Sequence, residues 1–161
     1  LIAYRDLAFI RPPGTLDGGD VLRLDRRLYI GVGGRSNHEG VQQLTKIVSP
    51  YGYTVYPVSV RGCLHLKSAV TQIADELLLM NPEWIDPLLF DGYNHLDVDE
   101  REIYAGNALY VAHNVIYPKS YPRTMDRIAA AGISISPVDM SEFIKAEGAV
   151  TCCSLLIHGS I

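Results

Sequence analysis

The segment Gly52-Tyr53-Thr54-Val55-Tyr56-Pro57-Val58 carries the pattern that organises this chain, because the pattern returns twice. It recurs as Gly132-Ile133-Ser134-Ile135-Ser136-Pro137-Val138, and midway stands Gly92-Tyr93-Asn94-His95-Leu96-Asp97-Val98, so the three glycines lie 40 residues apart. A glycine at the end of a helix supplies a left-handed cap, and the run that follows it favours a strand. The repeat therefore predicts three copies of one structural unit.

The residues before the first copy extend this unit towards the N-terminus. Val21–Leu24 and Leu28–Gly31 flank the charged turn Asp25-Arg26-Arg27, which predicts a β-hairpin. Ser36 followed by Glu39 forms a capping box, which predicts the start of a helix. Apolar residues then recur at helical spacing, at Val41, Leu44, Ile47 and Val48.

The two later copies show the same order of elements. Strands are predicted over 69–73 and 77–80 in the second copy, and over 109–112 and 115–117 in the third. A helix is predicted over residues 82–90, and another begins after Ser120, with Pro122 in its first turn. The repeated unit is thus strand, strand, helix, strand, which makes the fold class α/β.

Two further elements are predicted near the end of the chain. Ser141 caps a short helix, and the apolar run Val150–Ile157 reads as a closing strand. At the other end, Leu1–Tyr4 reads as a strand already in progress, so we expect the protein to continue upstream. Because one such unit cannot bury its own apolar face, the units must stack or circle. By pattern alone, a propeller-like ring and an open α/β sheet both remain open.

The composition excludes several classes of function. The 161 residues suffice for one domain, which we expect over residues 1–161, and the net charge of -4 argues against nucleic acid as a partner. No apolar run approaches the roughly 18 residues needed to span a bilayer. Three cysteines do not form a disulfide framework, so a reducing compartment such as the cytoplasm is expected. No Cys-x-x-Cys or His-x-x-x-His spacing indicates a metal site.

Cys152-Cys153 is the first candidate for chemistry, since a cysteine can act as a nucleophile when a histidine serves it. Neighbouring side chains of a strand point to opposite faces, so one cysteine is expected to face the core and the other the opposite face. Two buried cysteines that act only as small hydrophobic residues are the structural alternative.

Three further residue types complete the candidate chemistry. His65 could act as a general acid near neutral pH, or pack in the core. Asp17, in the segment Leu16-Asp17-Gly18-Gly19-Asp20, could bring a carboxylate into a cleft, or simply form a turn. Arg35 could bind a carboxylate, or carry a solvated charge. The remaining histidines are expected at the surface: His38, His95, His113 and His158.

Taken together, four segments resemble dimethylarginine dimethylaminohydrolases in order and spacing. They are Thr15-Leu16-Asp17-Gly18-Gly19-Asp20-Val21-Leu22, Gly34-Arg35-Ser36-Asn37, Leu64-His65-Leu66-Lys67-Ser68 and Thr151-Cys152-Cys153-Ser154, and Tyr121-Pro122-Arg123-Thr124 looks similar too. The resemblance runs from about residue 10 to residue 157. Each motif alone is a weak indication of the family, whereas four motifs in the same order and at similar spacing identify it.

The resemblance implies a fold. Members of this guanidine-modifying (pentein) superfamily form a propeller-like ring of five strand-strand-helix-strand modules. The three units read from the repeat agree with that ring, and they imply that about two modules are absent from this chain. The acidic residues with which the family's N-terminal part grips the substrate guanidinium have no counterpart here.

The resemblance also implies site residues. Cys152 matches the nucleophile, His65 the general acid and base, and Asp17 the carboxylate that orients His65, although some relatives carry glutamate there. Arg35 matches the position that binds the substrate carboxylate. Ala146 and Glu147 match a stretch that lines the substrate site.

The implied reaction is hydrolysis of an Nω-methylated arginine to citrulline and a methylamine through a covalent thiouronium, with no cofactor and a small-molecule substrate as partner. Two readings stay open beside it. One is another guanidine-modifying enzyme, an arginine deiminase or an amidinotransferase. The other is an inactive fragment that serves as a binding module. The oligomeric state stays open as well, a homo-oligomer included.

Overall fold

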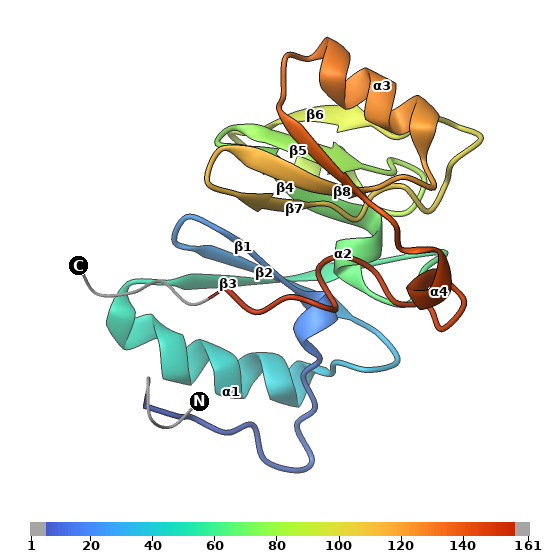
Figure 1. Cartoon of the computed structure of the whole chain (residues 1–161). Coiled ribbons are helices and arrows are strands. Elements are labelled where there is room, and N and C mark those ends of the chain that lie inside the picture. The colour runs from blue at the N-terminus through green and yellow to red at the C-terminus, as the bar shows by residue number, and fades with distance from the viewer. Residues whose placement is uncertain (1–5, 157–161) are drawn as a thin grey trace. The chain divides into compact units, whose positions relative to one another are not determined.

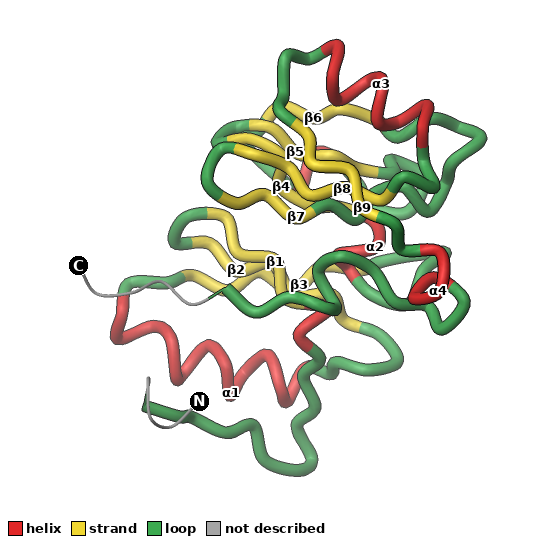
Figure 2. Tube along the Cα trace, viewed as in Figure 1, coloured by secondary structure: helices red, strands yellow, loops and turns green. Residues whose placement is uncertain are grey.

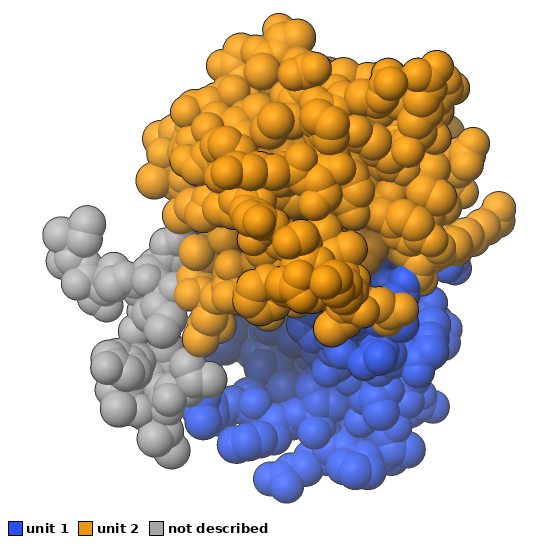
Figure 3. Space-filling view, turned by 45° about the vertical axis from the view of Figure 1, so that its right-hand side comes forward, with its two compact units in different colours: residues 1–60, 64–66 blue, residues 61–63, 67–161 orange. Residues whose placement is uncertain are grey.

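A computed structural model describes residues 6–156, so the predictions for Leu1–Tyr4, Ile157 and His158 lie outside the described residues. The chain divides into two compact units, residues 1–60 with 64–66 and residues 61–63 with 67–161 (Figure 3). Three separate three-stranded sheets make up the described strands, one in the first unit and two in the second (Figure 2).

The first unit holds the first sheet and its helix (Figure 1). Its elements are η1 (Gly18–Asp20), β1 (Val21–Leu24), β2 (Arg27–Val32), α1 (His38–Val48), η2 (Ser49–Tyr51) and β3 (Thr54–Ser59). β2 is the central strand, antiparallel to β1 and parallel to β3. Leu28 and Ile30 of β2 are buried against Val41 of α1, so the apolar stripe of α1 covers one face of this sheet.

The second unit repeats this arrangement twice. The first repeat has α2 (Leu66–Ala69), whose residues from Lys67 onward belong to this unit, then β4 (Val70–Ala74), β5 (Leu77–Met80), η3 (Pro87–Leu89) and β6 (Asn94–Asp97). The second has β7 (Leu109–Val111), β8 (Asn114–Pro118), α3 (Pro122–Ala130), β9 (Ile135–Val138) and α4 (Ser141–Ile144). In both sheets the middle strand is antiparallel to its predecessor and parallel to its successor. One hydrophobic cluster joins the two sheets, with Ile73, Leu79, Val115, Tyr117 and Ile128 among its buried residues.

The predicted 40-residue repeat is confirmed at the level of the backbone. Gly52, Gly92 and Gly132 have φ of 77°, 85° and 80°, the left-handed region that glycine occupies without steric cost. A strand follows each of them. All three copies of the predicted unit therefore have their three strands, the first and third copies also have the predicted α-helix before the last strand, and the described strands form no single open sheet.

The predicted cap of α1 is wrong by one residue. Asn37, not Ser36, precedes the helix, and its Oδ1 accepts the Gly40 N–H at 2.9 Å. Ser36 is fully buried, and its hydroxyl donates to Asp20 Oδ2 at 2.7 Å. A partner 16 residues upstream thus occupies the side chain that the local pattern assigned to the cap.

The predicted helix over 82–90 is also wrong. Residues 82–85 form turns around Asn81, whose Oδ1 accepts the Glu83 N–H, and η3 is the only helical segment that follows before β6 among the described residues. Pro87 has no N–H to donate, and the Asp86 side chain accepts from Leu88 N at 2.9 Å. These two residues favour a single 3₁₀ turn over a continued α-helix.

Two predictions near the C-terminus need correction. Ser141 is the first residue of α4 rather than its cap, and its N–H donates to the Asp139 side chain. The predicted strand Val150–Ile157 does not form over its described residues, since residues 150–153 make a turn and 154–156 have no regular structure. Among the described helices, none is long and apolar enough to cross a membrane.

Candidate active site

Asp17, which precedes β1 in the sequence, and His65 lie together in the first unit. Asp17 caps η1, where its Oδ1 accepts the Gly19 N–H at 2.8 Å. The same oxygen lies 3.4 Å from His65 Nε2, an ion-pair distance when the imidazole is protonated. The His65 side chain is mostly buried, at 14% exposure, whereas Asp17 is 36% exposed. One carboxylate thus faces both the turn and the histidine.

Gly19 leaves the space that the imidazole occupies. A Cβ atom on Gly19 would lie 2.6 Å from His65 Cγ and 2.8 Å from Cδ2, closer than carbon atoms approach in folded proteins. A Cβ atom on the neighbouring Gly18 would meet nothing within 4 Å. Of the two glycines, only Gly19 is required by the position of His65.

A buried network holds the two chain segments in register. The Asp20 carboxylate is buried and accepts the Ser36 hydroxyl at 2.7 Å and the Leu66 N–H at 3.1 Å. Ser36 Oγ in turn accepts the Asp17 N–H at 2.9 Å. Because Leu66 directly follows His65, Asp20 fixes the backbone beside the histidine while Ser36 fixes the backbone of Asp17. A buried carboxylate with satisfied partners is a rigid support for such a pair.

The surroundings of Asp17 favour its ionised form. The Gly19 N–H lowers the pKa of the Asp17 carboxyl below its usual value of 3.8, and the neighbouring His65 and Arg35 act in the same direction. Partial burial opposes these effects. Arg35 Nη1 lies 3.9 Å from Asp17 Oδ2 with a half-exposed side chain, so this ion pair is weak and open to exchange. Arg35, Asp17 and His65 are therefore brought together in the first unit.

Cys152 belongs to the second unit, and its predicted setting is wrong. Cys152 and Cys153 are both exposed, so neither faces the core. They lie in a turn in which both of their N–H groups donate to Ala149 O, at 3.1 and 3.3 Å. Adjacent residues of a turn need not point to opposite faces, so strand alternation gives no reason to prefer one thiol.

Ala146 and Glu147 follow α4 in the second unit and are exposed. Their N–H groups donate to Phe143 O and Ile144 O, at 3.0 and 2.9 Å. Glu147 has φ of 58°, which a non-glycine residue rarely adopts and which marks a tight turn. This segment leads into the Cys152 turn within five residues.

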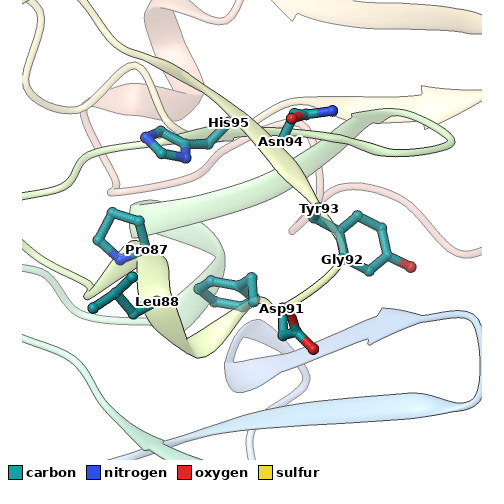
Figure 4. A pocket seen from close by; sticks show the side chains of 8 residues that line it. Pro87, Leu88, Asp91, Gly92, Tyr93, Asn94 and His95 are labelled. Atoms are coloured by element: carbon teal, nitrogen blue, oxygen red, sulfur yellow. The ribbon is translucent and has the colours of Figure 1, made fainter.

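Two hollows lie elsewhere in the second unit. One, of about 450 Å³, is lined by residues 87–88 and 90–95, and Figure 4 shows Pro87, Tyr93 and His95 around it. The other, of about 270 Å³, is lined by residues that include Glu83, Glu100 and Arg127. Neither hollow is lined by a predicted site residue. The candidate active site is therefore placed at Asp17 and His65, whose side chains can act as acid and base. Among residues 6–156, no three His, Cys, Asp or Glu side chains gather as metal ligands.

Sequence reasoning missed the supporting residues. Asp20 was visible in the quoted motif, but nothing local indicates that it binds Ser36 and Leu66. The two adjacent glycines before β1 could have indicated a special role for Gly19, because a simple turn does not need two glycines.

Comparison with known proteins finds relatives that match most of this chain. The N(G),N(G)-dimethylarginine dimethylaminohydrolase of Pseudomonas aeruginosa is 36% identical over 146 residues, covering 91% of this chain and 58% of the relative. That of Streptomyces coelicolor is 42% identical over 147 residues, covering 91% and 56%. The chain therefore spans little more than half the length of these relatives. No family model matches the sequence.

Solved structures show the same fold. A mutant of the Pseudomonas aeruginosa enzyme, with serine in place of a cysteine and citrulline bound, aligns with a TM-score of 0.83 at 34% identity, covering 89% of this chain and 56% of that one. The inosamine-phosphate amidinotransferase of Streptomyces griseus aligns with a TM-score of 0.78 at 18% identity, covering 88% and 46%, which indicates a shared fold alone.

Proposed function

We propose that this chain, which belongs to the dimethylarginine dimethylaminohydrolase family, supplies the catalytic residues that hydrolyse an Nω-methylated arginine to citrulline and methylamine or dimethylamine. The observation that carries the proposal is the Asp17–His65 pair, held at 3.4 Å by the Asp20 network and by the space above Gly19. A carboxylate that orients a partly buried histidine is the arrangement a general acid and base requires.

The proposed first step forms a covalent bond at Cys152. The thiolate of Cys152 attacks the guanidinium carbon, and a tetrahedral adduct forms. The positive charge of the bound guanidinium stabilises the negatively charged thiolate relative to the thiol. The thiolate is the form of cysteine that acts as a nucleophile. The exposure of Cys152 is compatible with access by a small substrate.

His65 then supplies the proton that the leaving group needs. An amine leaves poorly as an anion, so protonated His65 donates to the methylated nitrogen, the C–N bond breaks, and a thiouronium remains on Cys152. Neutral His65 next takes a proton from water, which attacks the same carbon. The C–S bond breaks, the hydroxyl proton of the adduct passes to solvent, citrulline leaves, and the Cys152 thiolate and the protonated His65 are restored.

Asp17 acts on His65 rather than on the substrate. Its carboxylate stays ionised near neutral pH, since the Gly19 N–H holds its pKa below the usual value. An ionised carboxylate orients the imidazole and stabilises the imidazolium that donates the proton. No cofactor is needed, because covalent catalysis divides one hard step into two easier ones.

Substrate recognition is assigned to Arg35, Ala146 and Glu147. Arg35 would exchange its weak contact with Asp17 for the substrate α-carboxylate, to which a guanidinium can bond through two parallel N–H groups. Ala146 and Glu147 would line the site near the Cys152 turn. The partner is thus a small molecule, an arginine derivative.

The proposal extends to the rest of the protein. Three modules of a five-module ring would make up three fifths of a family member, and the chain spans 56–58% of the two relatives named above. We therefore propose that residues 1–161 form the C-terminal portion of one such domain. The cytoplasmic location expected from the cysteine usage stays a prediction.

The test is the product formed by the full-length protein from two substrates. Dimethylarginine should yield citrulline and dimethylamine in equal amounts, with kcat/KM well above that for arginine. Citrulline and ammonia from arginine alone would instead indicate an arginine deiminase. No citrulline from either substrate would contradict the proposal.

A further inference from the structure

Asn107, two residues before β7, is a buried residue that the mechanism above does not use. Its Nδ2 donates to Thr151 Oγ1 and to Lys67 O, both at 2.8 Å. Its Oδ1 accepts the Thr151 N–H at 3.2 Å. Both polar atoms of this one side chain are thus engaged with Thr151, the residue next to Cys152, and all these residues belong to the second unit.

The backbone on both sides of Asn107 is hydrogen-bonded to Thr71. Thr71 of β4 is buried, and its hydroxyl donates to Gly106 O at 2.7 Å and accepts the Ala108 N–H at 3.0 Å. Gly106 permits a close approach, since a Cβ atom there would lie 2.7 Å from Ser68 O. The residues on both sides of Asn107 are therefore held by one side chain, that of Thr71.

The position also has a parallel in the other modules. Each module carries a polar residue shortly before its first strand: Asp17 before β1, His65 before β4 and Asn107 before β7. The first two form the pair described above, and the third lies in the corresponding segment of the third module. The repeat thus gives a reason to look for a role at Asn107 beyond packing.

We propose that Asn107 is a positioning residue for the nucleophile, which holds the Thr151–Cys153 turn so that the Cys152 thiol meets the substrate carbon. The reason is physical. The predicted strand does not form over residues 150–156, the part of it that the structure describes, and Thr151 lacks the ladder bonds that a strand would give its backbone. The amide of Asn107 instead accepts the Thr151 N–H and donates to the Thr151 hydroxyl, so two hydrogen bonds to one residue fix both its backbone and its side chain.

Asn81 offers a matched control in the same unit. It is equally buried, its Nδ2 donates to Ile103 O at 3.0 Å, and its Oδ1 accepts the Glu83 N–H at 3.0 Å. Truncating either asparagine removes buried hydrogen bonds and lowers stability. Only the Asn107 variant should alter the Cys152 turn, which separates positioning from simple stability.

This inference rests on the proposed function, and the experiment keeps the two apart. In the full-length protein, Asn107→Ala and Asn81→Ala are compared for melting temperature, for amide hydrogen exchange of the peptide covering residues 149–154, and for kcat and KM with dimethylarginine. Asn107→Ala should raise exchange in that peptide by at least about tenfold. It should lower kcat per folded molecule by at least about tenfold with KM nearly unchanged. Asn81→Ala should change neither.

The conservative variants of Thr151 give a second readout. Thr151→Ser keeps the hydroxyl that Asn107 binds and should retain turnover, whereas Thr151→Val should behave like Asn107→Ala. Unchanged exchange in Asn107→Ala, or a kcat loss no greater than its loss of folded protein, would overturn the positioning role. If wild type makes no citrulline while exchange still responds to Asn107→Ala but not to Asn81→Ala, the grip on the turn stands and the proposed reaction falls.

Discussion

Gly19 and His65 are in such close contact that a methyl group on Gly19 would lie 2.6 Å from His65 Cγ. The imidazole therefore occupies its place opposite Asp17 only because residue 19 has no side chain. Cγ lies at the base of the ring, so the whole imidazole must move to admit a Cβ atom. This contact gives a test of His65 that leaves every polar group of the site intact.

Gly19→Ala should reduce kcat/KM by roughly 100-fold, because displacement of a catalytic group by about an ångström has that effect. Gly18→Ala is the control, since a Cβ atom there meets nothing within 4 Å, and it should keep turnover. Steady-state kinetics and thermal melts of both variants decide the matter. Equal turnover in the two variants would show that the position of His65 is not critical.

Asp17→Asn should lower kcat by about 100-fold or more while the turn persists, because Asn Oδ1 can still accept the Gly19 N–H. The pH dependence of stability gives an independent check. The pKa of Asp17 is lowered in the folded protein, so its stabilisation is present at neutral pH and disappears as the pH falls below about 4. The difference in unfolding free energy between wild type and Asp17→Asn should therefore shrink as the pH falls from about 4 towards 2. A difference that stays unchanged throughout this acidic range would be incompatible with a carboxylate whose pKa is lowered by folding.

Arg35→Ala should raise KM for dimethylarginine by roughly 30-fold, equivalent to about 2 kcal/mol of a charge-assisted bond, with little change in kcat. Methylated agmatine lacks the carboxylate and should be processed equally by both forms. Arg23→Ala, which removes another arginine of the first unit, is the control. If methylated agmatine suffers as much as dimethylarginine, or if kcat falls instead of KM rising, then Arg35 acts through its contact with Asp17 at 3.9 Å and not on the carboxylate.

His65→Asn should fold normally yet lose turnover by roughly 100-fold or more. It should still react at Cys152 with an analogue whose leaving group is a halide, which needs no proton. His95→Asn is a matched control, because His95 also faces a carboxylate, Asp97, at 3.6 Å, but at the surface. Rates with both leaving groups and melting temperatures are compared. A His65→Asn protein that melts early and loses both reactions in proportion would return His65 to a packing role.

The elements that the sequence predicts correctly are those that local chemistry determines. Gly52, Gly92 and Gly132 must adopt positive φ, and the runs after them have the β-branched and aromatic residues that strands favour. The hairpin around Asp25 follows for the same reason. Such signals lie within a few residues of the feature they predict, so the three-module architecture could be read directly.

The errors arise where a distant partner outweighs the local pattern. Ser36 looks like a helix cap, but Asp20 binds its hydroxyl, so Asn37 takes that place. The run from Val150 has the composition of a strand, but Asn107 holds Thr151 in a turn from 44 residues away. Asp17, Arg35 and His65 were candidates by residue type and received their roles from the family resemblance, whereas the distances of 3.4 and 3.9 Å between them required the structure.

The central claim is that Cys152 forms the covalent intermediate, and trapping that intermediate tests it most directly. Full-length protein is mixed with dimethylarginine, quenched in acid during turnover, digested, and mapped by mass spectrometry, with Cys152→Ser and Cys153→Ser as companions. A thiouronium adduct should appear on Cys152 in wild type and in Cys153→Ser, and Cys152→Ser should give neither adduct nor citrulline. An adduct on Cys153, or citrulline from Cys152→Ser, would contradict the account.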